Sequence, residues 1–385
     1  MGFDERKLCI KHKRFTDSRT INFWEDFKKD NPLYAFTKFV NENDELELLF
    51  RGNDGKVTVY RNNHVVWDIK KLKKKKEYNV SFSREHIKYS DRAEELEDKL
   101  KELFCDNKDK NLKKFKVVDE NWICSVYKLL DVMFTDYFDY SKSTAKRELE
   151  KIFQQHLFTY VFNGNPQSKG YFVFDLEFAQ PYPCTAYRES KGNTNKPDML
   201  AVKWDAEGYK LVLIEVKSKA GSCDGKSSVQ KHLKGMGKYL NEEVFGKSVI
   251  KSRMLDAIKI IDNYKNLGLR GFKENNVPFY MCDFHKVGKW SDFKGIEILF
   301  VFTDEFIDDE KNKFNYEPSK GNEKGSIKWL QELQSSYEAS GIRNGLLKSV
   351  SEIENNEYFI DDKKFDVKVK FMSYTKKEGL QEEHL

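Results

Sequence analysis

Two carboxylates and a lysine in the stretch KPDMLAVKWDAEGYKLVLIEVKSK, residues 196–219, have the types and spacing that could do chemistry. Asp198 lies near the start of one apolar segment, and Glu215 lies near the end of the next. If residues 205–208 (DAEG) form the turn of an antiparallel hairpin, Asp198 and Glu215 are directly opposite each other. Directly opposed side chains have Cβ atoms about 4.5–5.5 Å apart. Two negative charges at that distance repel, so we expect a cation between them.

The two segments are apolar on both faces. Side chains alternate along a strand, so Lys217 shares the face of Glu215, and Asp198 shares the face of Leu200. The other face carries aliphatic residues such as Ile214. Strands of this kind are typical of the centre of a sheet covered by helices. The polar trio is therefore expected at one open end of a buried hairpin, and a register shift of one residue would disperse it.

Mg²⁺ is the cation that suits two such carboxylates, and Mn²⁺ is expected to substitute for it. Mg²⁺ prefers carboxylate oxygens, keeps several waters and completes its coordination shell with substrate phosphates. It can turn water into hydroxide and stabilise charge on phosphorus, while Lys217 could orient or deprotonate the attacking water. These residues predict a site for phosphodiester hydrolysis. The alternative is a pair of solvated acids at strand ends, because short strings of this kind also occur by chance.

Pro197-Asp198 followed by Glu215-Val216-Lys217 resembles the PD-(D/E)xK motif of the restriction-endonuclease-like nucleases. In that superfamily a helix precedes three strands, the second and third strands carry the motif, and another helix follows. The resemblance implies that Mg²⁺ is held by Asp198, Glu215 and the backbone carbonyl of Val216. It also implies that Lys217 assists the water. The resemblance covers residues 141–310 and neither flank.

Two further positions extend the resemblance. Family members often carry a Glu on the preceding helix, where RELEKIFQQHL offers Glu148 and Glu150. Glu150 is the favoured metal ligand, and an ordinary exposed helical Glu is the alternative for either residue. The following helix often carries a Gln and then a Tyr, here Gln230 and Tyr239, and Gln230 could position Lys217 or contact the substrate backbone. Together these positions weakly resemble the Shedu-type antiphage nucleases.

The elements that must position these residues follow an α/β pattern. A helix over 141–162, a strand at 171–178 and the two motif strands come first. Two helices and strands at 277–284 and 296–306 follow. With the resemblance, this order predicts a restriction-endonuclease-like core, which is a mixed central sheet flanked by helices in the order α-β-β-β-α-β.

The flanks have different patterns. Residues 45–83 alternate β-branched and aromatic residues between Asn, Asp and Gly turns, which predicts a small antiparallel meander, and helices follow it. A helix and a hairpin, EYFIDDKKFDVKVKFM, are expected near the C-terminus. We therefore predict an N-terminal accessory domain over 1–140, a nuclease domain over 141–310 and a C-terminal accessory region over 311–385.

Composition limits the class of protein. A chain of 385 residues is too long for one compact core. Charged residues make up 34 % but leave a net charge of only +5, which permits nucleic-acid binding without requiring it. Neither a membrane-spanning apolar run nor the apolar core of a signal peptide is present. The six cysteines are scattered without CxxC spacing, which is typical of reduced thiols in a cytoplasmic protein.

These observations predict a Mg²⁺-dependent endonuclease that acts on nucleic acid, DNA rather than RNA, and by the resemblance in bacterial or phage defence. Dimerisation is expected for double-strand cutting, since one metal site cuts one strand. The alternative is a catalytically silent or ligand-gated nuclease fold that acts as a nucleic-acid binding or sensor module. Among the histidines, His156 is interpreted as a satisfied, partly buried side chain. His232 and His285 have no ligand spacing, so surface positions are expected for both.

Overall fold

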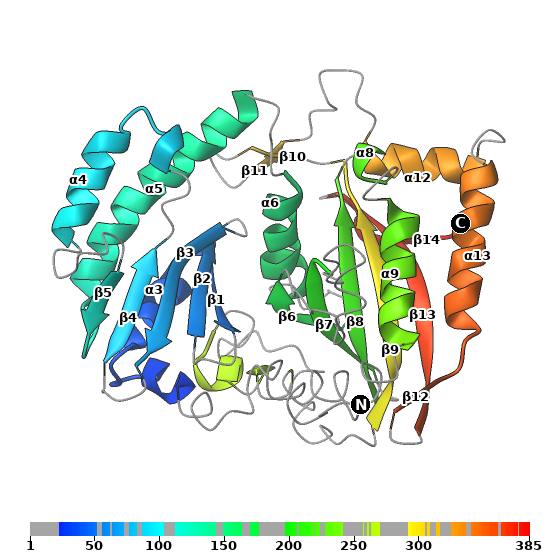
Figure 1. The fold of residues 1–385 in the computed structure, drawn as a ribbon, viewed down its shortest axis with the longest axis horizontal. Helices are drawn as coiled ribbons and strands as arrows, with labels where there is room; N and C mark the ends of the chain where they lie inside the picture. Colours follow the sequence, from blue (N-terminus) through cyan, green and yellow to red (C-terminus); the bar gives the residue numbers. More distant parts are fainter. Residues whose placement is uncertain are drawn as a thin grey trace, which may run out of the picture. The chain divides into compact units, whose positions relative to one another are not determined.

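The computed structural model (Figure 1) describes residues 23–51, 56–61, 64–72, 77–82, 87–103, 112–143, 149–163, 170–176, 197–205, 208–218, 220–223, 228–241, 257, 260–261, 263–269, 292–304, 306–308, 313–315, 325–335, 340–360, 363–375 and 377–385. The chain divides into two compact units. The meander unit comprises Lys13–Gln155 and Lys259–Asn275. The motif unit comprises Met1–His12, His156–Ile258 and Asn276–Leu385.

An antiparallel sheet of five strands in sequence order forms the centre of the meander unit. The meander predicted over 45–83 is therefore confirmed. Trp67 is fully buried there, and the rings of Phe36, Phe39 and Tyr127 pack around it, which explains the aromatic content of the neighbouring helices. The strands are β1 (Leu46–Arg51), β2 (Lys56–Arg61), β3 (His64–Lys71), β4 (Tyr78–Phe82) and β5 (Leu112–Phe115).

The helices described before the motif unit include one long helix, α5, and several shorter ones. Figure 1 shows α4 and α5 side by side, and the two helices pack against each other through residues such as Leu96 and Leu100, which are buried. The helices are η1 (Trp24–Phe27), α3 (Tyr34–Glu42), η2 (Ile87–Tyr89), α4 (Ala93–Leu103), α5 (Glu120–Ser143) and α6 (Leu149–His156).

A mixed sheet of seven described strands forms the centre of the motif unit, in the order β12-β13-β9-β8-β7-β6, with β14 also beside β13. Strand β7 is antiparallel to its two neighbours β6 and β8, whereas β8, β9 and β13 are parallel. The strands are β6 (Tyr171–Leu176), β7 (Met199–Asp205), β8 (Gly208–Lys217), β9 (Phe293–Phe302), β12 (Tyr358–Ile360), β13 (Lys363–Thr375) and β14 (Gly379–Glu383). The prediction of an α/β protein with one antiparallel sheet and one mixed sheet flanked by helices is confirmed.

Helices cover the face of this sheet that carries the motif side chains. In Figure 1, α9 and α13 lie alongside each other against the sheet, and α12 lies across their ends. Strands β8 and β9 are buried almost along their whole length, as central strands covered on both faces must be. The remaining described elements of the unit are the π-helix η3 (Leu157–Phe162), α8 (Ala220–Cys223), α9 (Val229–Asn241), β10 (Phe306–Asp308), β11 (Lys313–Asn315), α12 (Ser326–Ser335) and α13 (Ser340–Glu354).

The division of the chain differs from the predicted regions. Helix α5 runs from Glu120 to Ser143, so the predicted boundary between 140 and 141 lies within a helix. The segment 311–385, predicted as a separate accessory region, belongs to the motif unit and adds β12, β13 and β14 to its sheet. The hairpin predicted near the C-terminus is confirmed as β12 and β13. Its parallel pairing with β9 depends on residues far away in the sequence and has no local signal.

Two predicted elements are only partly described. The strand predicted at 277–284 lies outside the described residues. The second helix predicted after the motif is helical at 263–266, and the hydroxyl of Tyr264 donates to the carbonyl of Leu48 in the meander unit at 2.6 Å. No helix in the described part of the chain is long and apolar enough to cross a membrane.

Candidate functional site

The motif carboxylates lie at the ends of two adjacent central strands. The pairs of the β7–β8 hairpin run from Asp205–Gly208 at the turn to Met199–Ile214 at the open end. This is the register predicted from the DAEG turn, and the next residues outward are Asp198 and Glu215. Asp198 directly precedes β7 and is half-buried, whereas Glu215 is only 2 % exposed. The hairpin therefore brings the two carboxylates to the same end of the sheet.

Each carboxylate is held by a different donor. The backbone N–H of Val216 donates to Oδ2 of Asp198 at 2.7 Å. The Nζ of Lys217, itself 2 % exposed, donates to Oε1 of Glu215 at 2.6 Å. A charge buried this deeply is strongly destabilising unless an opposite charge offsets it. Lys217 therefore offsets the charge of Glu215, and Asp198 is bound to the backbone of Val216, the residue between Glu215 and Lys217 in the sequence.

Pro197 has a direct consequence for the backbone of Val216. The N–H of Val216 points towards the β7 side of the strand, and within a strand the C=O of a residue points the same way as its N–H. If the register continues beyond its last pair, Met199–Ile214, Pro197 falls opposite Val216. Proline has no N–H, so Pro197 cannot donate the ladder hydrogen bond that the Val216 carbonyl would otherwise accept there. The carbonyl oxygen of Val216 is thereby directed towards the segment that carries Asp198.

The second oxygen of Glu215 is the unusual atom of the site. Oε2 is buried and has no hydrogen-bond partner among the described residues. A buried polar atom without a partner costs about 1–3 kcal/mol, and more when the group is charged. Such a cost points to a ligand for Oε2 that the described residues do not supply.

A second buried glutamate of the same sheet shows the contrast. Glu297 in β9 pairs with Val212, so its side chain lies on the face opposite to that of Glu215. Tyr171 donates to Oε1 of Glu297, and Lys203 lies 3.4 Å from Oε2. Burial and the nearby Glu297 raise the pKa of the Tyr171 hydroxyl far above its ordinary value, so Tyr171 remains a donor. Because both oxygens of Glu297 have partners, this cluster has a structural role.

His232 is a residue of the site that the sequence pattern did not indicate. It lies on α9 and is 30 % exposed, and its Nδ1 lies 2.9 Å from Oε1 of Glu215. His232 is therefore partly exposed, and it also lies beside Glu215, a contact that the expected surface position did not include. The apolar periodicity of α9 could have indicated that His232 lies near the sheet. His232 borders the buried stripe of Val229, Leu233 and Met236 on the face that covers the sheet.

Gln230 lies on the other flank of α9. Its Nε2 donates to the carbonyl of Gly345 at 3.1 Å and lies 3.4 Å from the hydroxyl of Ser349, both in α13. Residues two positions apart on an α-helix are separated by about 200° around its axis, so Gln230 and His232 point away from each other. The described hydrogen bonds of Gln230 thus join two helices, and none of them goes to Lys217.

The other predicted site residues are placed as follows. Glu150 belongs to α6, but its side chain is not described. The side chain of Tyr239 is not described either, and Glu148 lies outside the described residues. His156 is half-buried and lies 3.1 Å from the hydroxyl of Tyr374, in agreement with a satisfied histidine. His285 lies outside the described residues.

The C-terminal segment supports the motif strand. The hydroxyl of Ser326, the first residue of α12, lies 2.7 Å from the carbonyl oxygen of Lys217 and 3.0 Å from the backbone nitrogen of Thr303. Asp304 accepts the N–H groups of Ile327 at 2.7 Å and Lys328 at 3.2 Å, and so caps the N-terminus of α12. Burial raises the pKa of Asp304 although these N–H groups act in the opposite direction.

The donor set fits a Mg²⁺ ion that keeps part of its water shell. No cluster of three or more His, Cys, Asp and Glu side chains suited to a metal occurs among the described residues. Two carboxylates and one carbonyl oxygen remain, from Asp198, Glu215 and Val216. Mg²⁺ is commonly bound by one or two carboxylates together with waters and substrate phosphates, and the partnerless Oε2 of Glu215 offers such a ligand.

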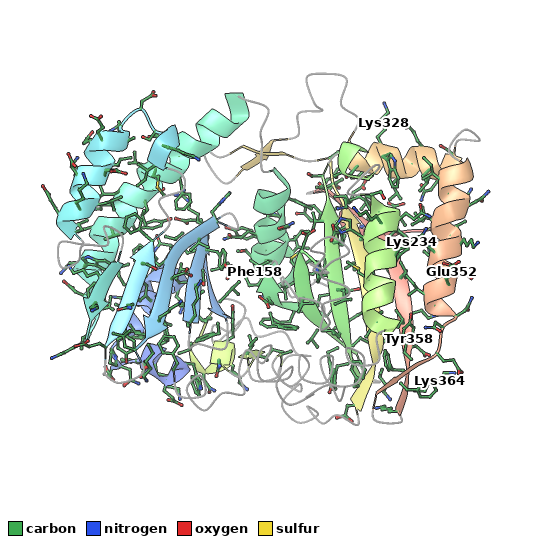
Figure 2. All side chains as sticks on the ribbon, in the orientation of Figure 1. Phe158, Lys234, Lys328, Glu352, Tyr358 and Lys364 are labelled. Atoms are coloured by element: carbon green, nitrogen blue, oxygen red, sulfur yellow. The ribbon has the colours of Figure 1, made fainter. Side chains whose placement is uncertain are left out.

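Exposed lysines occur on the helices that cover this face. Lys231 and Lys234 on α9 and Lys328 on α12 are exposed, and Figure 2 labels the last two on their helices. Positive side chains of this kind are available to phosphate groups.

No family model, no curated protein and no solved structure matches this chain.

Proposed function

We propose that the protein is a Mg²⁺-dependent nuclease that hydrolyses phosphodiester bonds. One observation carries the proposal. Glu215 is buried beside Lys217, opposite Asp198, with its Oε2 lacking a partner among the described residues. A purely structural ion pair would be expected to satisfy both carboxylate oxygens, as Glu297 does on the opposite face of the sheet.

Each residue of the site has a role in this proposal. Asp198, Glu215 and the carbonyl of Val216 would hold the metal, which when bound supplies Lewis-acid stabilisation and a water of lowered pKa. Lys217 keeps a positive charge beside the carboxylates, orients the attacking water and offsets the charge that develops on the phosphoryl group. The buried strands around the motif restrict bulk water, which strengthens these interactions.

The order of the elements supports a restriction-endonuclease-like core. Helix α6 precedes the antiparallel strands β6, β7 and β8, then α9 follows, and β9 lies parallel to β8. This is the α-β-β-β-α-β order that the motif implies by resemblance. A role in bacterial or phage defence rests on the resemblance to PD-(D/E)xK and Shedu-type nucleases alone.

DNA is the proposed substrate, with the nucleic-acid backbone as the group recognised. Exposed lysines on α9 and α12 are suited to phosphate contacts, whose strength falls with added salt. A homodimer would place two sites on a duplex, since one metal site cuts one strand. Mn²⁺ is expected to replace Mg²⁺, because both ions accept carboxylate and carbonyl oxygens.

Cleavage assays test the proposal directly. Supercoiled plasmid, linear duplex, single-stranded DNA and RNA are incubated with Mg²⁺, Mn²⁺ or EDTA and either the wild type or the Asp198→Asn or Glu215→Gln variant. The wild type should cut at least one DNA substrate in a metal-dependent way, and each variant should be slower by at least about 10²-fold. Glu297→Gln is the matched control, because it removes the charge of an equally buried glutamate on the other face.

The outcomes separate the candidate functions. Equal cleavage by wild type and Glu215→Gln would show that these residues are not the active site. Nucleic-acid binding by the wild type without cleavage of any substrate would favour the silent or ligand-gated alternative over the active nuclease.

A further inference from the structure

Oε1 of Glu215 is held from two sides by two different elements. Lys217 approaches from the same strand, with Nζ at 2.6 Å, and His232 approaches from α9, with Nδ1 at 2.9 Å. The other oxygen, Oε2, is buried without a hydrogen-bond partner among the described residues. The two oxygens of one carboxylate thus have different environments.

The fold places His232 at this position through helix packing. Val229, Leu233, Met236 and Leu240 are buried and form the stripe of α9 that faces the sheet. His232 lies three residues after Val229 and four before Met236, so it borders this stripe. Gln230 ties the opposite flank of α9 to α13, which limits rotation of the helix about its axis. The imidazole is therefore anchored by packing that is independent of Glu215.

The chemistry of the contact defines which nitrogen carries a proton. An ionised carboxylate only accepts hydrogen bonds, so a proton on Nδ1 of His232 would make the 2.9 Å contact with Oε1 of Glu215 favourable. With the nitrogens of Lys217 and His232 both within 3 Å of Oε1, rotation of the carboxylate about its terminal bond would break both contacts. Oε2 is consequently kept in the position away from Lys217 and His232.

We propose that His232 is a positioning residue that orients the Glu215 carboxylate so that Oε2 is presented to the metal. This inference rests on the proposed function, because it assigns Oε2 as a metal ligand. Groups that hydrogen-bond to metal ligands typically change metal affinity by about 10–100-fold when they are removed. The position of His232 on α9 would thus contribute to the metal affinity without any contact between His232 and the metal.

Metal binding without substrate is the readout that tests this role. Mn²⁺ affinity is measured by electron paramagnetic resonance and titration calorimetry for the wild type, His232→Ala, His232→Asn, His232→Gln and Asp198→Asn. The amide nitrogen of Asn lies near the position of Nδ1, whereas that of Gln lies near the position of Nε2. His232→Ala and His232→Gln should bind Mn²⁺ about 10–100-fold more weakly, and His232→Asn should approach the wild type.

The results distinguish this inference from the proposed function. If the wild type binds Mn²⁺, Asp198→Asn does not and His232→Ala binds like the wild type, the role of His232 is overturned while the metal site stands. Equal weakening in all three His232 variants would overturn the role of the Nδ1 donor. If the wild type itself binds no Mn²⁺, both the metal site and the role of His232 are overturned. Thermal melting of the metal-free proteins identifies any variant whose loss of binding reflects unfolding. The Mn²⁺ affinities of His232→Asn and His232→Gln then decide whether the nitrogen at the Nδ1 position orients Glu215.

Discussion

The hydroxyl of Ser326 lies 2.7 Å from the carbonyl oxygen of Lys217, directly after the strand that carries the Glu215–Lys217 pair. Ser326 is completely buried and begins α12, which belongs to the C-terminal part of the chain. The same hydroxyl is 3.0 Å from the backbone nitrogen of Thr303, at the end of β9. One side chain therefore joins two parallel strand ends to the helix that covers them.

Replacing Ser326 by Ala should destabilise the motif unit. The carbonyl of Lys217 and the N–H of Thr303 would each lose one partner but would keep their hydrogen bond to each other, at 3.0 Å. The expected cost is therefore that of a lost hydrogen bond, about 0.5–1.5 kcal/mol. Urea unfolding followed by tryptophan fluorescence measures this change. Ser335→Ala is the control on the same helix, because the Ser335 hydroxyl is exposed and donates only within α12. Equal midpoints for the two variants would contradict the prediction.

Replacing Pro197 by Ala should weaken metal binding. If the strand register continues to position 197, the new N–H there can donate to the Val216 carbonyl, and this hydrogen bond would compete with a metal for the oxygen. A net hydrogen bond of about 0.5–1.5 kcal/mol corresponds to roughly two- to tenfold weaker Mn²⁺ binding. Calorimetric titration of the folded Pro197→Ala protein with Mn²⁺ measures this change in affinity. Unchanged affinity would show that the Val216 carbonyl is not a ligand.

The hairpin register could be predicted because turn chemistry and alternation are local. Asp205 and Gly208 mark the turn, and every pair out to Met199–Ile214 follows from them. The parallel pairing of β13 with β9 could not be predicted, since it joins residues such as Val367 and Ile296 with no connecting turn between them. This is why the C-terminal segment was expected as a separate region.

Contacts within the site were harder to predict than the motif itself. The sequence indicates that α9 follows the motif, but not which flank of the helix meets Glu215. The resemblance favoured Gln230, whereas the described contact comes from His232 on the other flank. Ser326 could not be found from the sequence either, because its role depends on the tertiary placement of α12 beside β8 and β9.

Replacing Lys217 by Met should separate catalysis from metal binding. Removing one partner of a buried ion pair costs about 3–5 kcal/mol, and cleavage should fall by about 10²–10³-fold with the loss of the positive charge. Mn²⁺ affinity should fall much less than cleavage, because the removal of a competing cation offsets the loss of one of the two contacts that orient Glu215. Parallel cleavage and Mn²⁺ titrations measure both quantities.

Lys203→Met is the matched control for that experiment. Lys203 pairs with the buried Glu297 on the opposite face of the same sheet, so its removal should lower stability while the folded fraction still cuts. Cleavage by Lys217→Met at the wild-type rate, or equal loss of cleavage in both variants, would contradict a chemical role for Lys217.

The Asp304 cap should make stability depend on pH. Burial raises the pKa of Asp304 above its ordinary value of 3.8, so the folded protein favours the protonated form more than the unfolded chain does. The stability that this shift contributes is fully present below pH 3.8 and is lost as the pH rises through the pKa of Asp304 in the folded protein. The side-chain amide of the Asp304→Asn variant does not titrate and keeps an oxygen for the N–H of Ile327. The urea midpoint of the wild type minus that of Asp304→Asn should therefore fall as the pH is raised from about 4 towards neutrality, the range that the direction of the shift implies. A difference that rises with pH would mean that the N–H groups at the start of α12 outweigh the cost of burying the charge.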